Sequence, residues 1–400
     1  MSTEDTRAGA RGGAPRVLFY VQHLLGIGHL ARASRIAGAL VDDGFDVTMV
    51  TGGAPVPGFP GPGVRHLALP AILAGDSGFS GITDENRNPV DDAFKARRRD
   101  LLLAAYRDIR PDAVVIEAFP FGRRQVRFEL LPLLEAIAAE PKRPLVLTSL
   151  RDILQERAKP GRDEESVDLV ERHFDRVLVH GDPAFVRLDD TFPLAGRIAE
   201  RVVYTGLVAP PLPELPEERY DVVVSAGGGA VGASLVRAAR DAAVALDPAL
   251  RWCLIAGPNL PEAEFAALVA DTPDNVVAVR FRKDFPSLVR GARLSVSQAG
   301  YNTVCDLLRA DCPALLVPFA AGGETEQTAR AERLERLGLA RVITEEALTA
   351  QTLAEAVGAM LSAPTRQPIG LDLDGARRTA AILRDLLQDE GDRQGLVPGH

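Results

Sequence analysis

The feature that most constrains the fold is an alternation of strand, turn and helix patterns that runs along the chain twice. The first series opens with the apolar run Arg16–Gln22, a glycine-rich turn and a helical pattern that ends near Gly44. The alternation restarts at 220, after a segment with four prolines between 210 and 216. Such alternation favours parallel, doubly wound sheets. The sequence therefore predicts an α/β protein with two Rossmann-like domains that face a central cleft, where open α/β sheets bind ligands.

These patterns also suggest where the domains begin and end. We expect six segments: a disordered tail (1–14), a first Rossmann-like domain (15–208), a stiff proline-rich linker (209–219), a second Rossmann-like domain (220–365), a C-terminal helix that could pack back on the first domain (366–390) and a second disordered tail (391–400).

Composition excludes several classes of protein. A chain of 400 residues is too long for one ordinary core, which agrees with two domains. The net charge of −9 argues against nucleic-acid binding through a broad basic surface. The three cysteines (Cys253, Cys305 and Cys312) follow no metal-binding spacing and form no disulfide framework, which suits a reducing cytoplasm. We see no signal peptide and no apolar run of about 18 residues, so any membrane contact would be peripheral.

A glycine-rich turn in the second series is the strongest local signal. Gly227, Gly229 and Gly232 form a G-x-G-x-x-G pattern between a predicted strand and a predicted helix over Ala233–Leu246. Glycines let a phosphate approach the backbone, and the helix N-terminus offers free N–H groups. A dinucleotide site would also need an acidic residue after the next strand, which here runs into Pro258 instead. We therefore favour a phosphate cradle over an NAD(P) site or a ligand-free turn.

His29 is the leading candidate for catalysis. It opens the first helix at the tip of the first strand, where a neutral imidazole could take a proton from a hydroxyl. A helix N-terminus lowers the pKa of histidine, which would keep it neutral near pH 7. The alternative is a surface or core histidine, which is the ordinary fate of the residue. His23 is a weaker candidate, and His66, His173 and His180 are interpreted as structural.

A polar motif from Ser295 to Ala331 begins in the predicted strand LSVS and reads SVSQAGYNTVCDLLRADCPALLVPFAAGGETEQTARA. In it, Asn302 and Thr303 could cap a helix and donate hydrogen bonds to a diphosphate. Asp306, one turn further, could accept hydrogen bonds from ribose hydroxyls, and Glu326 and Gln327 could hold sugar hydroxyls. The alternatives are an ordinary capped helix and a solvated charged face. We interpret the motif as a nucleotide-sugar pocket.

Taken together, these motifs resemble the GT-B glycosyltransferases of family 28, a group that includes the lipid II-forming N-acetylglucosaminyltransferase, and a bacterial branch of predicted glycosyltransferases. The first-half segment GIGHLARA is similar to the family's G-G-H-x-x-P loop through Gly28 and His29. The resemblance spans about 16–365. The family pattern S-x-x-G-x-x-T-x-x-E…G-x-P…P…Q-x-x-N-A is met here by Ser297, Gly300, Thr303, Asp306, Pro313, Pro318, Gln327 and Ala331.

The resemblance implies roles for individual residues. His29 would be the general base, Asp306 would hold the ribose, and Glu326 with Gln327 would contact the sugar. The second domain would bind the donor, with the pyrophosphate near Ser225 and the uracil near Phe281. The inferred donor-binding set is Ser225, Gly227, Gly228, Gly229, Phe281, Gln298, Gly300, Asn302, Thr303, Asp306, Glu326 and Gln327.

The chain departs from the family pattern at several positions. Asp306 is one methylene shorter than the family Glu, Ala31 or Arg32 stands where the family has Pro, and Asp311 replaces a Gly. Arg330 stands in place of Asn. A D-x-D sequence at 372–374, the metal signature of a different glycosyltransferase fold, lies outside the predicted nucleotide loops. We therefore expect no essential metal and no cofactor beyond the nucleotide sugar. Glu324 and Glu332 match the E-x₇-E mark of some retaining enzymes but lie after Pro318 rather than before the proline-ended strand, so we expect inversion.

The first domain would bind the acceptor. The loop from Glu117 to Arg124 joins aromatic and basic groups after a strand, so it could hold a phosphate-bearing acceptor or be a solvated helix start. The arginine triplet at 97–99 is expected on an exposed helix face. The weak acceptor candidates are Gly28, Phe121, Arg123 and Arg124.

The predicted function is transfer of a hexose or N-acetylhexosamine from a nucleotide diphosphate sugar, UDP-linked by the resemblance, to a hydroxyl of a small or lipid-linked acceptor. Three alternatives stay open. A nucleotide-sugar hydrolase or 2-epimerase of the same fold would consume the donor without an acceptor, and an inactive binding protein would bind the nucleotide without turnover. A dehydrogenase would bind NAD(P).

Overall fold

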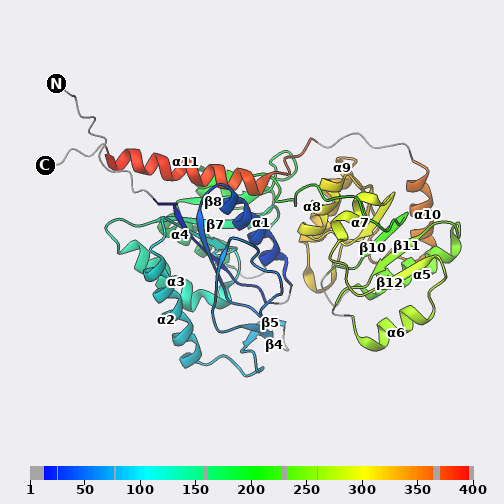
Figure 1. The fold of residues 1–400 in the computed structure, drawn as a ribbon, viewed down its shortest axis with the longest axis horizontal. Helices are drawn as coiled ribbons and strands as arrows, with labels where there is room; N and C mark the ends of the chain where they lie inside the picture. The colour runs from blue at the N-terminus through cyan, green and yellow to red at the C-terminus, as the bar shows by residue number, and fades with distance from the viewer. Residues whose placement is uncertain are drawn as a thin grey trace.

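The protein folds into two α/β domains, each built on a parallel sheet (Figure 1). This confirms the predicted architecture of two doubly wound domains. Among the described residues, no helix is both long and apolar enough to cross a lipid bilayer. The structure is a computed structural model that describes residues 13–24, 26–75, 78–155, 160–227, 232–258, 260–363 and 370–395.

The first domain contains a seven-stranded sheet in the order β3-β2-β1-β6-β7-β8-β9, and every neighbouring pair is parallel. A two-stranded antiparallel hairpin of β4 (Leu73–Gly75) and β5 (Gly78–Thr83) lies outside this sheet. The central strands are apolar and buried because helices cover both faces. The strands of the sheet are β1 (Arg16–Val21), β2 (Asp46–Thr51), β3 (Arg65–Ala68), β6 (Ala113–Glu117), β7 (Leu145–Arg151), β8 (Arg176–His180) and β9 (Val202–Tyr204).

Alternate residues of β1 face the two cores of this domain. Leu18 and Tyr20 pack with residues of α2 and α3, whereas Val17 and Phe19 pack with residues of α1. The period-two alternation of the strand therefore assigns each face of the sheet to its own helices. The helical elements are α1 (Gly28–Asp42), α2 (Asp92–Ile109), η1 (Arg124–Val126), α3 (Arg127–Ala138), α4 (Arg162–His173), η2 (Leu188–Asp190) and η3 (Ala195–Arg201).

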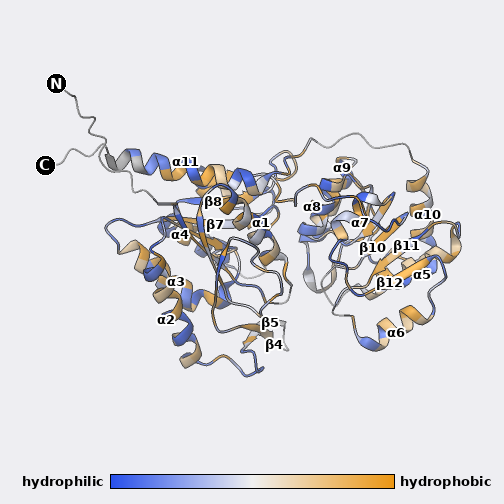
Figure 2. Ribbon diagram, viewed as in Figure 1, coloured by the Kyte–Doolittle hydropathy of each residue, from blue (hydrophilic) through white to orange (hydrophobic). Residues whose placement is uncertain are grey.

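The second domain has a six-stranded parallel sheet in the order β12-β11-β10-β13-β14-β15. Its strands are the apolar centre of this domain (Figure 2). The strands are β10 (Val222–Ser225), β11 (Trp252–Ile255), β12 (Val276–Val279), β13 (Leu294–Ser297), β14 (Ala314–Leu316) and β15 (Ala340–Val342). The helices are α5 (Ala233–Ala245), α6 (Glu262–Ala270), α7 (Phe285–Gly291), α8 (Tyr301–Ala310), η4 (Ala321–Gly323), α9 (Glu326–Arg336) and α10 (Ala350–Leu361).

The C-terminal helix α11 (Gly375–Gly395) lies over the first domain rather than the second (Figure 1). It packs against α1, where Ala380 and Leu383 join the same core as the residues of α1. Within the described residues the helix begins at Gly375, later than the expected start at 366. The chain thus crosses between the domains twice.

One expectation about the first domain was wrong. Arg98, in the arginine triplet, is fully buried rather than on an exposed helix face. Its Nε and Nη2 donate to the two carboxylate oxygens of Glu129 at 2.8 and 2.6 Å, and its Nη1 donates to the Gly52 carbonyl at 2.9 Å. A paired and hydrogen-bonded guanidinium tolerates burial, and only the spatial neighbour Glu129 makes this possible.

Candidate active site

His29 lies at the edge of the first sheet where the two central strands end. α1 begins at Gly28 after the loop that follows β1, so His29 occupies the first turn of the helix. Its Nδ1 lies 2.9 Å from Oε1 of Glu117, the last residue of β6. β1 and β6 are adjacent and parallel, so the two side chains meet at the carboxyl edge of the sheet.

Glu117 is buried and surrounded by hydrogen-bond donors. Its Oε1 also accepts from Nη2 of Arg32, and its Oε2 accepts from the Ser149 hydroxyl at 2.5 Å. Burial alone would raise the pKa of Glu117, but the Arg32 charge and the bonds from His29 and Ser149 outweigh it and lower the pKa to about 2. An ionised carboxylate only accepts, so the proton of neutral His29 is on Nδ1 and its Nε2 is the basic atom.

The environment of His29 keeps its imidazole neutral. Burial lowers the pKa of His29 to about 3, the Arg123 charge adds to this effect, and the bond to Glu117 opposes it. The His29 side chain is 16% exposed to solvent. Among the described residues, its Nε2 has no hydrogen-bond partner. A neutral imidazole with an accessible Nε2 and an anion behind Nδ1 is the arrangement of a general base.

His180 extends the hydrogen-bond network of His29, Glu117 and Ser149 further into the first domain. Its Nε2 lies 2.9 Å from the Ser149 hydroxyl and its Nδ1 lies 2.8 Å from the Thr205 hydroxyl. The side chain is fully buried, and burial lowers its pKa to about 3. His23 also has a backbone partner, since its Nε2 lies 2.8 Å from the Ala54 carbonyl.

The polar motif of the second domain meets the His29 loop across the domain boundary. α8 begins at Tyr301, after Gly300 as its N-cap, and Asn302 Nδ2 donates to the Gly28 carbonyl at 3.0 Å. Asn302 Oδ1 is buried without a hydrogen-bond partner among the described residues. Asn302 therefore lies beside the residue that precedes His29.

Asp306 also faces the first domain. Its Oδ1 accepts from Arg35 Nη2 of α1 at 2.9 Å, and the carboxylate is buried. Burial raises the pKa of Asp306, although the Arg35 charge opposes it. Thr303, on the same helix, is half-buried.

Gln327 connects two loops of the second domain. Its Oε1 accepts from the backbone N–H of Ala299 at 3.0 Å and of Phe319 at 3.3 Å. These two loops follow β13 and β14, so the Gln327 carboxamide fixes both strand ends. With Oε1 engaged in this way, its amide group is the part left to donate to a ligand.

Glu326 and Arg330 belong to an ion-pair network between the domains. Arg330 is fully buried and donates from Nε and Nη2 to both oxygens of Asp152, at 2.9 and 2.6 Å. Its Nη2 also lies 2.7 Å from Glu326 Oε1, and Arg151 pairs with Glu326 Oε2. Arg151 is the last residue of β7 in the first domain and Asp152 follows it, so the Arg that replaces the family Asn joins the domains.

The glycine-rich turn places Ser225, Gly227 and Gln298 together. Gly227 has φ 72°, a backbone conformation that favours glycine, and a Cβ there would lie 2.9 Å from Gln298 Oε1. Ser225 Oγ accepts from the Gly227 N–H at 3.4 Å. The predicted Gly228 and Gly229 lie outside the described residues. Phe281, in the turn after β12, is 60% exposed.

The acceptor candidates divide into two kinds. Arg123 donates from Nε to the Gln22 carbonyl at 2.8 Å, and no described carboxylate pairs with it. Burial and the nearby Arg151 charge lower the pKa of Arg123 to about 10. Arg124, in contrast, pairs with Glu165 on α4. Phe121 packs edge-on against Phe192 at 5.1 Å and belongs to the core.

Several residues of this site were not singled out from the sequence. Among them, Arg32, Arg35, Ser149, Arg151 and Asp152 carry contacts described above. The available signal was position: Ser149 to Asp152 close the strand next to β6, and Arg32 follows His29 by one helical turn. Polar residues at the carboxyl ends of central parallel strands therefore indicate the site.

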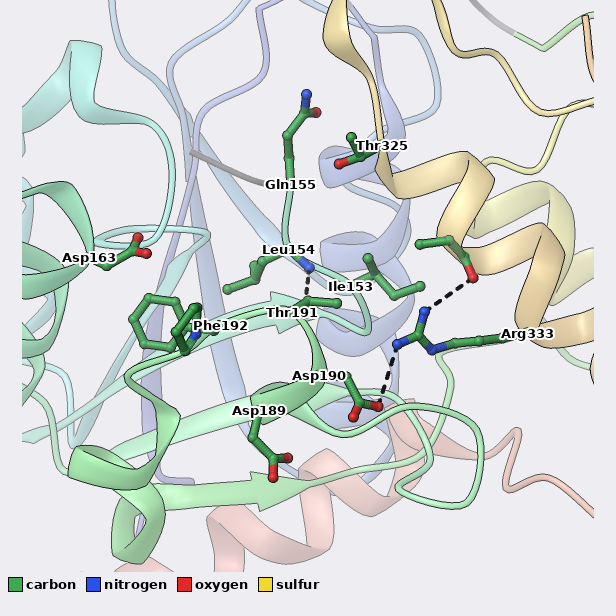
Figure 3. A pocket seen from close by; sticks show the side chains of 12 residues that line it. Ile153, Leu154, Gln155, Asp163, Asp189, Asp190, Thr191, Phe192, Thr325 and Arg333 are labelled. Carbon is green, nitrogen blue, oxygen red and sulfur yellow. Dashed lines mark hydrogen bonds and ion pairs between the residues drawn. The ribbon is translucent and has the colours of Figure 1, made fainter. Parts of the chain in front are cut away.

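A separate hollow of about 430 Å³ lies between the domains (Figure 3). The loop after β7 and the segment after η2 form one wall, and α9 forms the other. Arg333 lies 3.5 Å from Asp190 across the hollow, and Leu154 N–H donates to the Thr191 hydroxyl at 3.3 Å. None of the predicted site residues lines it. Its lining residues are Ile153, Leu154, Gln155, Asp163, Asp189, Asp190, Thr191, Phe192, Pro193, Thr325, Ala329 and Arg333.

Comparisons with known proteins point to glycosyltransferases. A family model described as "Glycosyltransferase family 28 C-terminal domain" matches residues 222–369. Two relatives are each named UDP-N-acetylglucosamine--N-acetylmuramyl-(pentapeptide) pyrophosphoryl-undecaprenol N-acetylglucosamine transferase. The one from Rhodospirillum rubrum is 29% identical over 84% of this chain and 82% of its own. The one from Phenylobacterium zucineum is 29% identical over 85% of this chain and 88% of its own.

Solved structures agree in fold. The calicheamicin glycosyltransferase CalG4 matches with a TM-score of 0.59 and 18% identity, over 96% of this chain and 100% of its own. MurG of Acinetobacter baumannii matches with a TM-score of 0.57 and 16% identity, over 94% of this chain and 99% of its own. The two facing parallel-sheet domains and the polar site between them define a nucleotide-sugar glycosyltransferase of the GT-B fold. Within that class, residues 222–369 match the C-terminal domain of glycosyltransferase family 28, which confirms the resemblance found from the motifs.

Proposed function

We propose that the protein transfers N-acetylglucosamine from UDP-N-acetylglucosamine to a hydroxyl of a phosphate-bearing, lipid-linked acceptor, with inversion and without a metal. The observation that carries the proposal is the His29–Glu117 pair, 2.9 Å apart, at the point where Asn302 of the second domain contacts Gly28. We take the donor and the acceptor from the names of the two relatives described above.

The reaction is a single displacement at the anomeric carbon. His29 Nε2 takes the proton of the acceptor hydroxyl as its oxygen bonds to that carbon, and the bond to the diphosphate oxygen breaks on the opposite face. The imidazolium that forms is stabilised by the Glu117 carboxylate behind Nδ1. The sugar thus passes from the diphosphate to the acceptor oxygen with its configuration inverted.

The leaving UDP carries the negative charge that develops in the transition state. Backbone N–H groups at the start of α8 and near Gly227 are suited to receive it, since helix N-termini and glycine turns bind phosphates. Gln327 and Glu326 start α9 and would hold the sugar hydroxyls, with the Gln327 amide directed by its two backbone contacts. Asp306 would bind the ribose, displacing or sharing Arg35.

The acceptor proposal rests on Arg123. Its guanidinium is partly buried beside His29 and Arg151, and no described carboxylate pairs with it. A partly buried cation that has no carboxylate partner among the described residues and lies next to a second cation favours an anionic ligand. A diphosphate linkage on the acceptor would supply that charge within reach of the base.

The test measures UDP release from UDP-N-acetylglucosamine, with and without a short-chain prenyl diphosphate carrying N-acetylmuramyl-pentapeptide. We expect release that depends on the acceptor. The His29→Gln variant should lose about 10²- to 10⁴-fold in kcat while UDP binding by calorimetry is retained. His66→Gln, which changes an exposed histidine on β3, is the matched control.

Each other outcome points to an alternative. Donor consumption without the acceptor would support a hydrolase or epimerase, and UDP binding with no turnover on any acceptor would support an inactive binding protein. Near-normal turnover of His29→Gln would remove His29 from the role of base.

A further inference from the structure

One face of α1 is in contact with α8 of the other domain. Positions 28, 32 and 35 recur at helical spacing and share this face. The Gly28 carbonyl accepts from Asn302, and Arg35 donates to Asp306. Between these two contacts, the Arg32 guanidinium lies over the ring of Tyr301, 5.1 Å from its centroid. The helix that carries the base is therefore packed directly on the second domain.

Arg32 has unusual surroundings for a charged residue. It is 2% exposed, and its Nη2 donates to the same Glu117 oxygen that accepts from His29. Its Nε is buried without a hydrogen-bond partner among the described residues. The two contacts that hold this guanidinium are thus the Glu117 carboxylate and the Tyr301 ring, whose π face attracts a cation.

Tyr301 is itself fixed to the first domain. Its hydroxyl donates to the His180 carbonyl at 2.8 Å and accepts from the Val208 N–H at 2.9 Å. Arg330, which pairs with Asp152, also approaches the ring at 5.7 Å from its centroid. The ring position therefore depends on the relative arrangement of the two domains.

We propose that Arg32 is a positioning residue that couples the second domain to the base: its guanidinium orients Glu117 toward His29, and the Tyr301 ring holds that guanidinium in place. This inference rests on the proposed role of His29. If the domains separated, Arg32 would lose the ring and gain access to water. The base would then be fully assembled only in the domain arrangement that brings α8, with the donor motif, against α1.

The charged neighbours of His29 and Glu117 come from several elements. His29 lies near the charges of Arg32 on α1 and Arg123 after β6, and Arg123 in turn lies near Arg151 of β7. Arg32 lies near Asp152 and Tyr301, and Ser149 and His180 are neutral members of the network. Arg32 lowers the pKa of both Glu117 and His29. Its removal leaves the Glu117 anion less compensated, so the pKa of His29 should rise, by about one unit for a cation at this range.

The experiment follows the protonation of His29 by NMR in the full-length protein with isotopically labelled histidine. The His29 signal is assigned with His29→Gln. We expect His29 in Arg32→Gln to protonate about one pH unit higher than in the wild type, and Arg32→Lys, which keeps the charge, to restore the wild-type midpoint. Arg35→Gln is the matched control, since it removes a cation from the same helix face that contacts Asp306 rather than Glu117.

Two further variants test the contribution of the second domain. Tyr301→Leu removes the ring and should raise the His29 midpoint in the same direction as Arg32→Gln. Tyr301→Phe keeps the ring and should titrate as the wild type does. An unshifted midpoint in both Arg32→Gln and Tyr301→Leu would overturn the inference, and if Arg32→Gln fails to fold, Tyr301→Leu decides alone.

Kinetics separate this inference from the proposed function. Arg32→Gln should lower kcat at pH 7 about tenfold with little change in the KM for UDP-N-acetylglucosamine, because Arg32 acts through Glu117. If His29→Gln retains turnover, the proposed function fails whatever the NMR shows. If His29→Gln is inactive while Arg32→Gln keeps the wild-type midpoint and kcat, only the coupling by Arg32 fails.

Discussion

Two buried charge networks lie side by side in this protein, and they differ in composition. The network around Glu117 combines one carboxylate and one guanidinium with two neutral imidazoles, those of His29 and His180. The network around Arg330 combines two carboxylates with two guanidiniums and no histidine. The first contains imidazoles, which can exchange a proton with a substrate, whereas the second consists of ion pairs.

The two networks also differ in where they lie relative to the domain boundary. The Glu117 network joins β6, β7 and β8 with α1, all of which belong to one domain. The Arg330 network connects the end of β7 with α9 across the domain boundary. We infer that the first network sets the chemistry of the base and the second sets the arrangement of the domains, and that variants of the two should fail in different ways.

The largest expected effect comes from Glu117→Gln. The amide keeps the shape of the carboxylate but removes the charge that fixes the Nδ1–H tautomer of His29 and stabilises the imidazolium. We expect kcat for acceptor-dependent UDP release to fall by about 10²- to 10⁴-fold, with UDP binding retained.

Glu135→Gln, at an exposed position on α3, is the control for loss of a carboxylate. A Glu117→Gln enzyme within a few-fold of the wild-type kcat would show that the pair is structural. The comparison between the two networks would then lose its basis.

The Arg330 network should affect stability instead. Asp152→Ala leaves the fully buried Arg330 without its bidentate partner, which costs about 3–5 kcal/mol of unfolding free energy. The double variant Asp152→Leu/Arg330→Met removes both charges and should recover most of that loss. Denaturant unfolding measures both. Arg65→Ala, which breaks an exposed pair with Asp46, should cost less than about 1 kcal/mol. A small effect of Asp152→Ala would mean that the pair is hydrated in solution.

The contrast also shows what the sequence could predict. The two parallel sheets followed from the alternation of apolar runs, and His29 from its place between a strand and a helix. Gln327 and Asp306 came from the polar motif and from the family resemblance. The sequence did not show that the Gln327 oxygen would accept from two backbone N–H groups or that Asp306 would contact Arg35. Those contacts depend on which strand ends lie next to one another.

The buried arginines were the least predictable part. Arg32, Arg98 and Arg330 are at most 2% exposed, although arginine is ordinarily a surface residue. Each has a carboxylate partner far along the chain, at Glu117, Glu129 and Asp152. Burial of a cation is tolerated only with such a partner, and the pairing arises from the tertiary fold. Local pattern therefore predicted an exposed face where the structure has a buried pair.

Acid should weaken the protein through the first network. The folded protein keeps His180 neutral down to a pKa of about 3, whereas an unfolded chain protonates histidine near pH 6.5. The unfolded state therefore binds more protons below pH 6.5, and stability is lost as the pH falls from there toward 3. At pH 5 this one group accounts for about 2 kcal/mol.

The measurement is the unfolding free energy at pH 7 and pH 5. His180→Gln should reduce the loss between the two by about 2 kcal/mol, while His66→Gln, exposed on β3, should leave it as in the wild type. An equal acid loss in His180→Gln and the wild type would contradict a neutral, buried His180.

The smallest expected effect distinguishes two neighbouring arginines that the sequence treated alike. Arg124 already pairs with Glu165, so Arg124→Gln removes a neutralised cation and should leave the acceptor KM nearly unchanged. Arg123 has no carboxylate partner among the described residues, so Arg123→Gln should raise the KM for the prenyl diphosphate acceptor about tenfold and leave UDP binding alone. Because Arg123 also lowers the pKa of His29, its loss should move the protonation of His29 to higher pH. Equal acceptor KM values for the two variants would reject an anion site at Arg123 and leave the base network intact.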